Sequence, residues 1–249
     1  MIYYPRMFLT FIYAFFCFSM GFIISLARPF NANNLYLTGL ILRSKAFTIL
    51  GISFEKRNSE LPKNIFPAVF MSNHQNNIDV LTGGACVKPK TVLLGKKSII
   101  WVPVFGQFYA LSGNQFINRR NPEAAKKSML QLTRRIVENK LSVWILPEGT
   151  RSKGRGLLPF KKGGFITAIN AQVPIIPVVF SSYAKTLDLT KLRSGRIIAK
   201  FMEPIHTKGL SIEHAEELME KTHKLFERTI KELDQEISDA LLPKQEFLS

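Results

Sequence analysis

Cysteine and acidic residues are scarce in this chain of 249 residues, which has two cysteines and 18 aspartates and glutamates. Neither Cys17 nor Cys86 has the spacing of a metal ligand, and no disulfide framework is expected from two cysteines. The four histidines form no H-E-x-x-H or similar zinc pattern, so no metal site is predicted. Internal repeats and low-complexity stretches are also lacking.

The shortage of acids leaves a formal charge of +16, from 34 Lys and Arg against 18 Asp and Glu. Between Ala85 and Phe165 there are 16 basic residues and three acids, a net charge of +13. From Ser211 onward the balance reverses, with ten acids against five basic residues. A surplus of this size indicates an anionic partner, such as nucleic acid, a membrane surface or a phosphorylated substrate. The alternative for most of these lysines is a solvated basic face.

The first segment carries a long apolar run. Met7 to Ala27 contains 21 residues without a charge, bracketed by Arg6 and Arg28. At ~1.5 Å per residue a helix of this length could cross a hydrocarbon core of about 30 Å. A cleaved signal peptide is the alternative, with Ser25-Leu26-Ala27 as its cleavage site, but the run exceeds the usual ~7–15 apolar residues.

A second apolar stretch, Leu35 to Phe54, is interrupted by Arg43 and Lys45. It makes a poor spanning helix but could lie in the membrane interface, with its basic side chains reaching the headgroups. We therefore expect residues 1–58 to be membrane-anchoring helices that either span the bilayer or embed in it. The flanking charges do not decide their orientation.

Beyond Asn58, strand-like runs alternate with helical ones. The expected strands are Ile65–Met71, Thr91–Leu94, Phe116–Ile117, Leu141–Leu146, Val173–Phe180 and Arg196–Met202. The expected helices run from Pro122, after an Asn121 cap, to about Asn139, from Gly163 to Ala171, and from Ser211 to about Leu242. This alternation predicts an α/β domain over residues 59–249, with a mostly parallel or mixed sheet flanked by helices.

Polar clusters follow two of these strands. The first, NHQNNID (residues 73–79), contains His74 and Asp79, and an aspartate on one imidazole nitrogen leaves the other free to act as a base. A loop histidine beside an N-capping aspartate is the alternative. The second, LPEGTRS (residues 146–152), predicts a tight turn in which Arg151 either pairs with Glu148 or binds a phosphate.

Two further blocks complete the pattern. Lys96, Lys97 and the segment GNQFINRR (residues 113–120) place basic side chains near strand ends, where they suit a phosphate or an ordinary basic surface. The segment VPIIPV (residues 173–178) has no reactive group and predicts a buried strand whose prolines place it at a sheet edge or mark strand ends.

Together, in this order and spacing, the four blocks resemble the lysophosphatidic acid acyltransferases, or 1-acylglycerol-3-phosphate acyltransferases, of the glycerolipid acyltransferase superfamily, in their bacterial form. NHQNNID matches the family's N-H-x4-D block, and the segment from Gly95 to Arg120 matches the second block. LPEGTRS matches the third block with Leu146 in place of the usual phenylalanine, and VPIIPV matches the fourth.

The resemblance implies a role for each matching residue. His74 would be the general base and Asp79 the residue that orients it, while Lys96, Arg119, Glu148, Gly149 and Arg151 would lie at the substrate site. The implied reaction transfers an acyl chain from acyl-CoA or acyl-acyl-carrier-protein to the 2-hydroxyl of lysophosphatidic acid, giving phosphatidic acid. It needs no metal or bound cofactor, and nucleic acid is not an expected partner. The implied location is the inner membrane, with the catalytic domain facing the cytoplasm, where the donors are.

Two alternatives stay open from the sequence. The acceptor could be glycerol-3-phosphate or another lysolipid, because the blocks do not distinguish these substrates. A non-catalytic protein that uses its basic face to bind membranes would explain the charge and the apolar run, but would leave His74, Asp79 and the EGTR turn without a role.

Overall fold

A central sheet separates two layers of helices in this computed structural model, which describes residues 2–240. The sheet has seven strands in the order β1-β7-β6-β2-β5-β3-β4. All neighbouring strands are parallel except β6 and β7, so the sheet is mixed. The predicted α/β class, with a mixed sheet flanked by helices, is confirmed.

Each of the six expected strands has a counterpart whose bounds differ by a few residues, and β1 is an additional strand. They are β1 (Ile52–Arg57), β2 (Val69–Ser72), β3 (Thr91–Lys96), β4 (Gln115–Ile117), β5 (Ser142–Ile145), β6 (Ile175–Phe180) and β7 (Gly195–Phe201). β1 was not predicted, because its residues lie at the end of the apolar stretch that we expected to be a helix.

The helices are α1 (Tyr3–Ala27), α2 (Asn33–Leu50), α3 (Asp79–Cys86), α4 (Phe105–Leu111), α5 (Pro122–Asn139), α6 (Gly163–Ala171) and α7 (Ala215–Asp239). The predicted start of α5 is confirmed, since the Asn121 side chain accepts a hydrogen bond from the Ala124 N–H at 2.9 Å. α6 has the predicted bounds. The predicted last turn of α7, at residues 241–242, lies outside the described residues.

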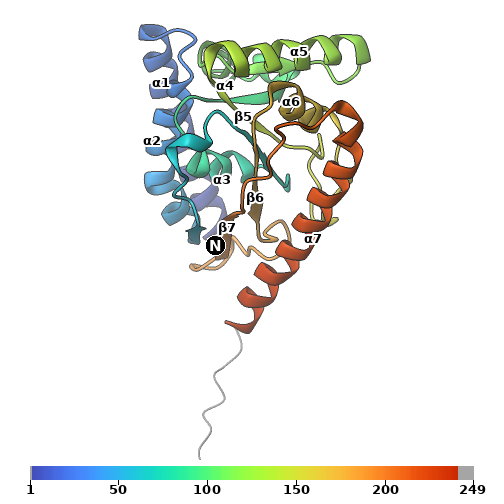
Figure 1. Ribbon diagram of the computed structural model, residues 1–249. Helices are drawn as coiled ribbons and strands as arrows, with labels where there is room; N and C mark the ends of the chain where they lie inside the picture. Colours follow the sequence, from blue (N-terminus) through green and yellow to red (C-terminus); the bar gives the residue numbers. More distant parts are fainter. Residues whose placement is uncertain (1, 241–249) are drawn as a thin grey trace, which may run out of the picture.

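Alternate side chains of each inner strand enter opposite cores. In β2, Val69 and Met71 pack with α5, α6 and α7, whereas Phe70 packs with α1, α2 and α3. Figure 1 shows the two layers, with α1 and α2 on one side of the strands and α7 on the other. Because both faces are covered, the inner strands read as continuous apolar runs. Each large apolar side chain that is fully buried stabilises the fold by ~1.5–3 kcal/mol.

Of the two placements predicted for the prolines of VPIIPV, a sheet edge or strand ends, the sheet edge is wrong. β6 lies inside the sheet, between β7 and β2, although Pro174 does mark its beginning. Pro177 is tolerated inside the strand because it lies directly before the residues that pair with β7, Val178 to Phe180. Its carbonyl accepts the Met202 N–H at 2.9 Å. The N–H that proline lacks would have pointed to the same side of the strand as this carbonyl.

The expected anchor segment divides into three elements. α2 ends at Leu50, and Gly51 (φ +66°) turns the chain into β1, which pairs with β7. The stretch from Leu35 to Phe54 is therefore a helix followed by a sheet strand, and not one interfacial helix. The proposed boundary at residue 58 falls directly after β1.

α1 packs against the α/β domain along one side and is open along the other. Arg6, near its first turn, is 6% exposed and donates to the carbonyls of Leu189, Lys191 and Leu192. Near its other end, the hydroxyls of Ser25 and Ser112 are 3.2 Å apart. By length and composition α1 could cross a membrane. Its outward face carries large exposed apolar side chains: Phe8, Leu9, Phe11, Ile12, Phe15, Phe16, Ile23 and Leu26.

Candidate active site

The predicted site residues gather at the end of the sheet where the carboxyl ends of the parallel strands lie. β2, β5, β3 and β4 are adjacent and parallel, so their carboxyl ends meet there. His74 follows β2, the EGTR turn follows β5, Lys96 ends β3, and Arg119 follows β4. In α/β sheets, ligands bind at the carboxyl ends of the strands.

His74 and Asp79 form a hydrogen-bonded pair. Asp79 is the first residue of α3, and its Oδ2 accepts a hydrogen bond from Nδ1 of His74. The same oxygen accepts the N–H groups of Gln75 at 2.8 Å and Asn76 at 3.1 Å. Asp79 therefore both closes the loop before α3 and orients the imidazole. It does not cap α3, because it is the first helical residue and accepts from N–H groups that precede the helix, so the alternative of an N-capping aspartate is wrong.

The hydrogen bond determines which ring nitrogen of His74 is free. A carboxylate is only an acceptor, so the neutral imidazole carries its proton on Nδ1 and presents the lone pair of Nε2. The His74 side chain is 15% exposed, and that of Asp79 is 9% exposed. An imidazole with one nitrogen held and the other open is suited to accept a proton from a bound hydroxyl.

Glu148 joins the turn after β5 to His74. Its Oε1 accepts the backbone N–H of His74 at 2.5 Å, and its Oε2 accepts the N–H of Leu158 at 3.0 Å. The residue is 3% exposed. Burial raises the pKa of Glu148 to about 7, against the lowering effect of the two N–H donors. Both carboxylate oxygens of Glu148 thus accept backbone N–H groups, and the sequence did not predict these hydrogen bonds.

The expected alternative of a Glu148–Arg151 pair is not realised among residues 2–240. Arg151 is exposed and lies three residues after Glu148, whose carboxylate is engaged by the two backbone donors. Two backbone bonds continue the connection between the loops. The N–H of Ser152 donates to the backbone carbonyl of His74 at 2.8 Å, and the N–H of Lys153 donates to the backbone carbonyl of Gln75 at 2.9 Å. Arg151 lies directly before this pair, with its side chain open to solvent.

Arg119 and Gly149 are brought together. The Arg119 guanidinium donates to the carbonyl of Gly149, and its burial lowers the pKa of this arginine. Gly149 has φ +70°, which explains the glycine, and its N–H closes the turn by donating to Leu146 at 3.0 Å. Lys96 is exposed at the end of β3, the strand between β5 and β4. Arg151, Lys96 and Arg119 thus end or follow the neighbouring strands β5, β3 and β4.

Several residues of this site were not predicted. The amide of Asn73 donates to Phe180 and accepts its N–H, both at 2.9 Å. The amide of Gln75 donates to Ser181 and accepts the N–H of Tyr183, both at 2.8 Å. The hydroxyl of Tyr183 donates to Oδ1 of Asp79. The amides of the NHQNN block were the available signal for the first two residues, whereas no sequence pattern pointed to Tyr183.

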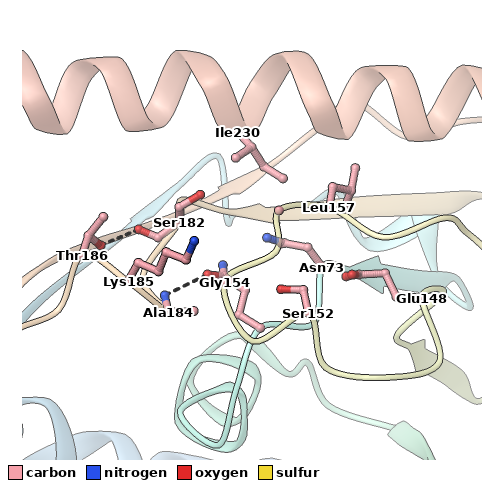
Figure 2. Close-up of a pocket in the computed structure, with 12 residues that line it drawn as sticks. Asn73, Glu148, Ser152, Gly154, Leu157, Ser182, Ala184, Lys185, Thr186 and Ile230 are labelled. Atoms are coloured by element: carbon pink, nitrogen blue, oxygen red, sulfur yellow. Dashed lines mark hydrogen bonds between the residues drawn. The ribbon is translucent and has the colours of Figure 1, made fainter.

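A cavity of about 260 Å³ lies between α7 and the loops that follow β2 and β5. Figure 2 shows Ile230 of α7 above it, Glu148 and Asn73 at one end, and Lys185 at the other. The His74 ring does not line this cavity. Among residues 2–240, no group of three or more His, Cys, Asp or Glu side chains could hold a metal ion.

Comparison with known proteins identifies the family. Residues 53–181 match the family model described as acyltransferase. The chain is 42% identical over 235 residues to the 1-acyl-sn-glycerol-3-phosphate acyltransferase of Haemophilus influenzae, covering 94% of this chain and 97% of that protein. The chain belongs to this acyltransferase family. Membership confirms the resemblance and the enzyme class expected from the four blocks, all of which lie inside the matched region.

A second relative and a solved structure are also similar to this chain. The Escherichia coli 1-acyl-sn-glycerol-3-phosphate acyltransferase is 36% identical over 239 residues, which cover 96% of this chain and 97% of the relative. The crystal structure of the 1-acyl-sn-glycerophosphate acyltransferase from Thermotoga maritima matches with a TM-score of 0.67 at 23% identity, covering 94% and 98% of the two chains. This second similarity shows a shared fold over nearly the whole length of both chains.

Proposed function

We propose that this acyltransferase moves an acyl chain from a thioester to the 2-hydroxyl of lysophosphatidic acid, producing phosphatidic acid. The observation that carries the proposal is the hydrogen bond from His74 Nδ1 to Asp79, which leaves Nε2 as the free base at the edge of the sheet. The relatives named above, which match along almost their whole length, support the choice of acceptor.

The reaction follows from the free Nε2. His74 removes the proton of the 2-hydroxyl while the oxygen attacks the thioester carbonyl, and a C–O bond forms. The tetrahedral intermediate then collapses, the C–S bond breaks, and the thiol leaves with the proton from the imidazolium. Asp79 stabilises the imidazolium between these steps, and general-base assistance of this kind is worth ~10²–10⁴ in rate. No acyl-enzyme and no metal or other cofactor is needed, because the hydroxyl attacks directly.

The basic residues account for the anionic head of the acceptor. We assign its phosphate to Arg151, with Arg119 and Lys96 beside it, because guanidinium groups offer paired donors to phosphate oxygens. Glu148 and Gly149, which we expected at the substrate site, support it through the backbone contacts described above. The donor is acyl-CoA or acyl-acyl-carrier-protein. The +13 charge between Ala85 and Phe165 favours anionic donors of either kind.

We infer that α1 embeds in the membrane surface and does not cross the bilayer. Arg6 near one end and Ser25 near the other both contact the same α/β domain, whereas the ends of a spanning helix lie on opposite sides of a core about 30 Å thick. The exposed apolar face of α1 would then lie among the acyl chains. In this arrangement α1 and α2 serve as the anchor at the inner membrane, and the catalytic domain faces the cytoplasm. β1 lies within the expected anchor segment 1–58 but pairs with β7, so we assign it to the catalytic domain together with residues 59–249.

The test is thiol release by the purified protein with a panel of acceptors and both donors. We expect release of free thiol only when lysophosphatidic acid is present, together with formation of phosphatidic acid. Preference for glycerol-3-phosphate or another lysolipid would replace the acceptor in this proposal. Release of no thiol with any acceptor, from a protein that binds anionic vesicles, would favour the non-catalytic alternative.

A further inference from the structure

Tyr183 occupies the oxygen of Asp79 that His74 does not use. Its hydroxyl donates to Oδ1, while His74 and two backbone N–H groups share Oδ2. Tyr183 comes three residues after β6, outside the four sequence blocks and outside the region matched to the family model. Three side chains from the ends of β2 and β6 and the start of α3 are thus connected in one chain of hydrogen bonds.

The position of Tyr183 is strongly constrained. The residue is 1% exposed, and its N–H donates to the Gln75 side chain at 2.8 Å. Its ring lies edge-on to Phe180, with 6.5 Å between ring centroids. Burial and the charge of Asp79 raise the pKa of Tyr183 well above its usual value, so the phenol stays neutral and remains a donor.

A hydrogen bond to a carboxylate stabilises its negative charge and makes it a weaker base. The strength of the bond that Asp79 makes to the imidazole of His74 therefore depends on the donor at the other oxygen. A stronger donor at Oδ1 leaves the imidazolium of His74 less stabilised, and loss of that donor leaves it more stabilised. The same donor also restrains the plane of the carboxylate.

We propose that Tyr183 is a positioning residue of the acyl transfer, which holds the Asp79 carboxylate and moderates its interaction with His74. This inference rests on the proposed role of His74 as the base. The competing interpretation is that Tyr183 only packs the loop after β6 against α3, where its hydroxyl also lies 3.4 Å from Thr82 Oγ1. Packing requires the ring, whereas positioning requires the hydroxyl.

The decisive variant is Tyr183→Phe, which keeps the ring and removes the hydroxyl. We expect kcat to fall roughly tenfold, because the Asp79 carboxylate loses the bond that restrains its plane. The acid limb of the pH–rate profile should move upward by about half to one pH unit, because the unshared carboxylate stabilises the imidazolium more strongly. Two other titratable groups lie near the Tyr183–Asp79–His74 hydrogen bonds, Glu148 beside Asp79 and Cys86 beside Tyr183. The Tyr183→Phe variant leaves both of them unchanged. Tyr13→Phe is the matched control, since it removes a tyrosine hydroxyl of α1 that donates to the carbonyl of Ile41 in α2.

A second variant keeps the residue intact in case Tyr183→Phe folds poorly. Replacing Tyr183 alone with 3-fluorotyrosine makes the phenol a stronger donor, so the acid limb should move downward. Opposite shifts in the two variants are the expected result. An unmoved acid limb in both, in enzyme that depends on His74, would overturn the inference and leave a packing role. A wild-type enzyme whose turnover survives His74→Ala would instead contradict the proposed function.

Discussion

The backbone N–H of His74 donates to Oε1 of Glu148 across 2.5 Å, and this bond joins the loops that follow β2 and β5. The histidine is therefore held at two points, through its ring by Asp79 and through its backbone by Glu148. Glu148 was expected to lie at the substrate site, and its buried carboxylate is engaged by two N–H donors. The carboxylate thereby helps to determine where the imidazole lies.

Replacing Glu148 with glutamine tests this connection. Glutamine has one acceptor oxygen, so one of the two N–H donors, from His74 or Leu158, would face an amide NH₂. A buried donor left without a partner costs ~1–3 kcal/mol. Misplacing the base by a fraction of an ångström should also lower kcat about ten- to a hundredfold. Both KM values should change little. Glu138→Gln, at an exposed position of α5, is the control.

The raised pKa of Glu148 predicts a pH dependence of stability. Its pKa is about 7 in the folded protein and ~4.3 in the unfolded chain, so the folded protein binds the proton more tightly. The contribution is present below pH ~4.3 and is lost as the pH rises to about 7, and it amounts to roughly 4 kcal/mol. The free energy of unfolding measured between pH 4 and 8 should therefore fall less in Glu148→Gln than in the wild type. Parallel curves would show that this carboxyl is not protonated in the folded protein at neutral pH.

Arg151 should act on the acceptor alone. Arg151→Lys retains the charge but loses the planar pair of donors, and charge-assisted bonds of this kind are worth ~1.5–3 kcal/mol. We expect kcat/KM for lysophosphatidic acid to fall roughly ten- to a hundredfold, while KM for the acyl donor is nearly unchanged. Arg134→Lys, on the exposed side of α5, should have no effect. An unchanged acceptor KM in folded Arg151→Lys would remove this residue from the phosphate site.

The apolar face of α1 should control membrane binding. Phe11 is 69% exposed and Phe15 is 51% exposed, so a double change to glutamate places charge in the surface expected to enter the lipid. Binding to anionic vesicles should weaken strongly, while activity on substrate dispersed in detergent persists. The double change to leucine should bind like the wild type. Vesicle flotation that is equal for the glutamate and leucine forms would deny α1 an anchoring role.

Substitution is a cleaner test than deleting residues 1–30. Arg6 lies in that segment and donates to three carbonyls of the loop before β7, which would lose their partner. The deletion would thus unsettle the domain as well as the anchor. A loss of activity after deletion would not separate the two effects.

Periodicity and chain order were enough to predict most of the fold. Alternating strands and helices predicted the α/β class, and the Asn121-Pro122 pair located the start of α5. β1 was missed because Ile52–Phe54 continues an apolar stretch, and only the left-handed Gly51 separates helix from strand. The interior place of β6 was left undecided, because a proline at the end of a ladder and a proline at a sheet edge have the same sequence.

The site was predictable in its residue types but not in its contacts. The NHQNNID block indicated the His74–Asp79 pair, because the two partners are only five residues apart. Tyr183 donates to Asp79 from 104 positions away, and Glu148 accepts from His74 across 74 positions. Contacts of such range depend on the order of strands in the sheet, which local pattern does not encode.

The most direct test of the account is turnover by His74→Ala. Its transfer of acyl groups to lysophosphatidic acid should fall ~10²–10⁴-fold or more, because the general base is removed and the carboxylates of Asp79 and Glu148 are engaged by other donors. The melting curve should stay close to that of the wild type, since His74 lies in a loop after β2 and its backbone bond to Glu148 is retained. A folded His74→Ala protein with near wild-type turnover would contradict the account.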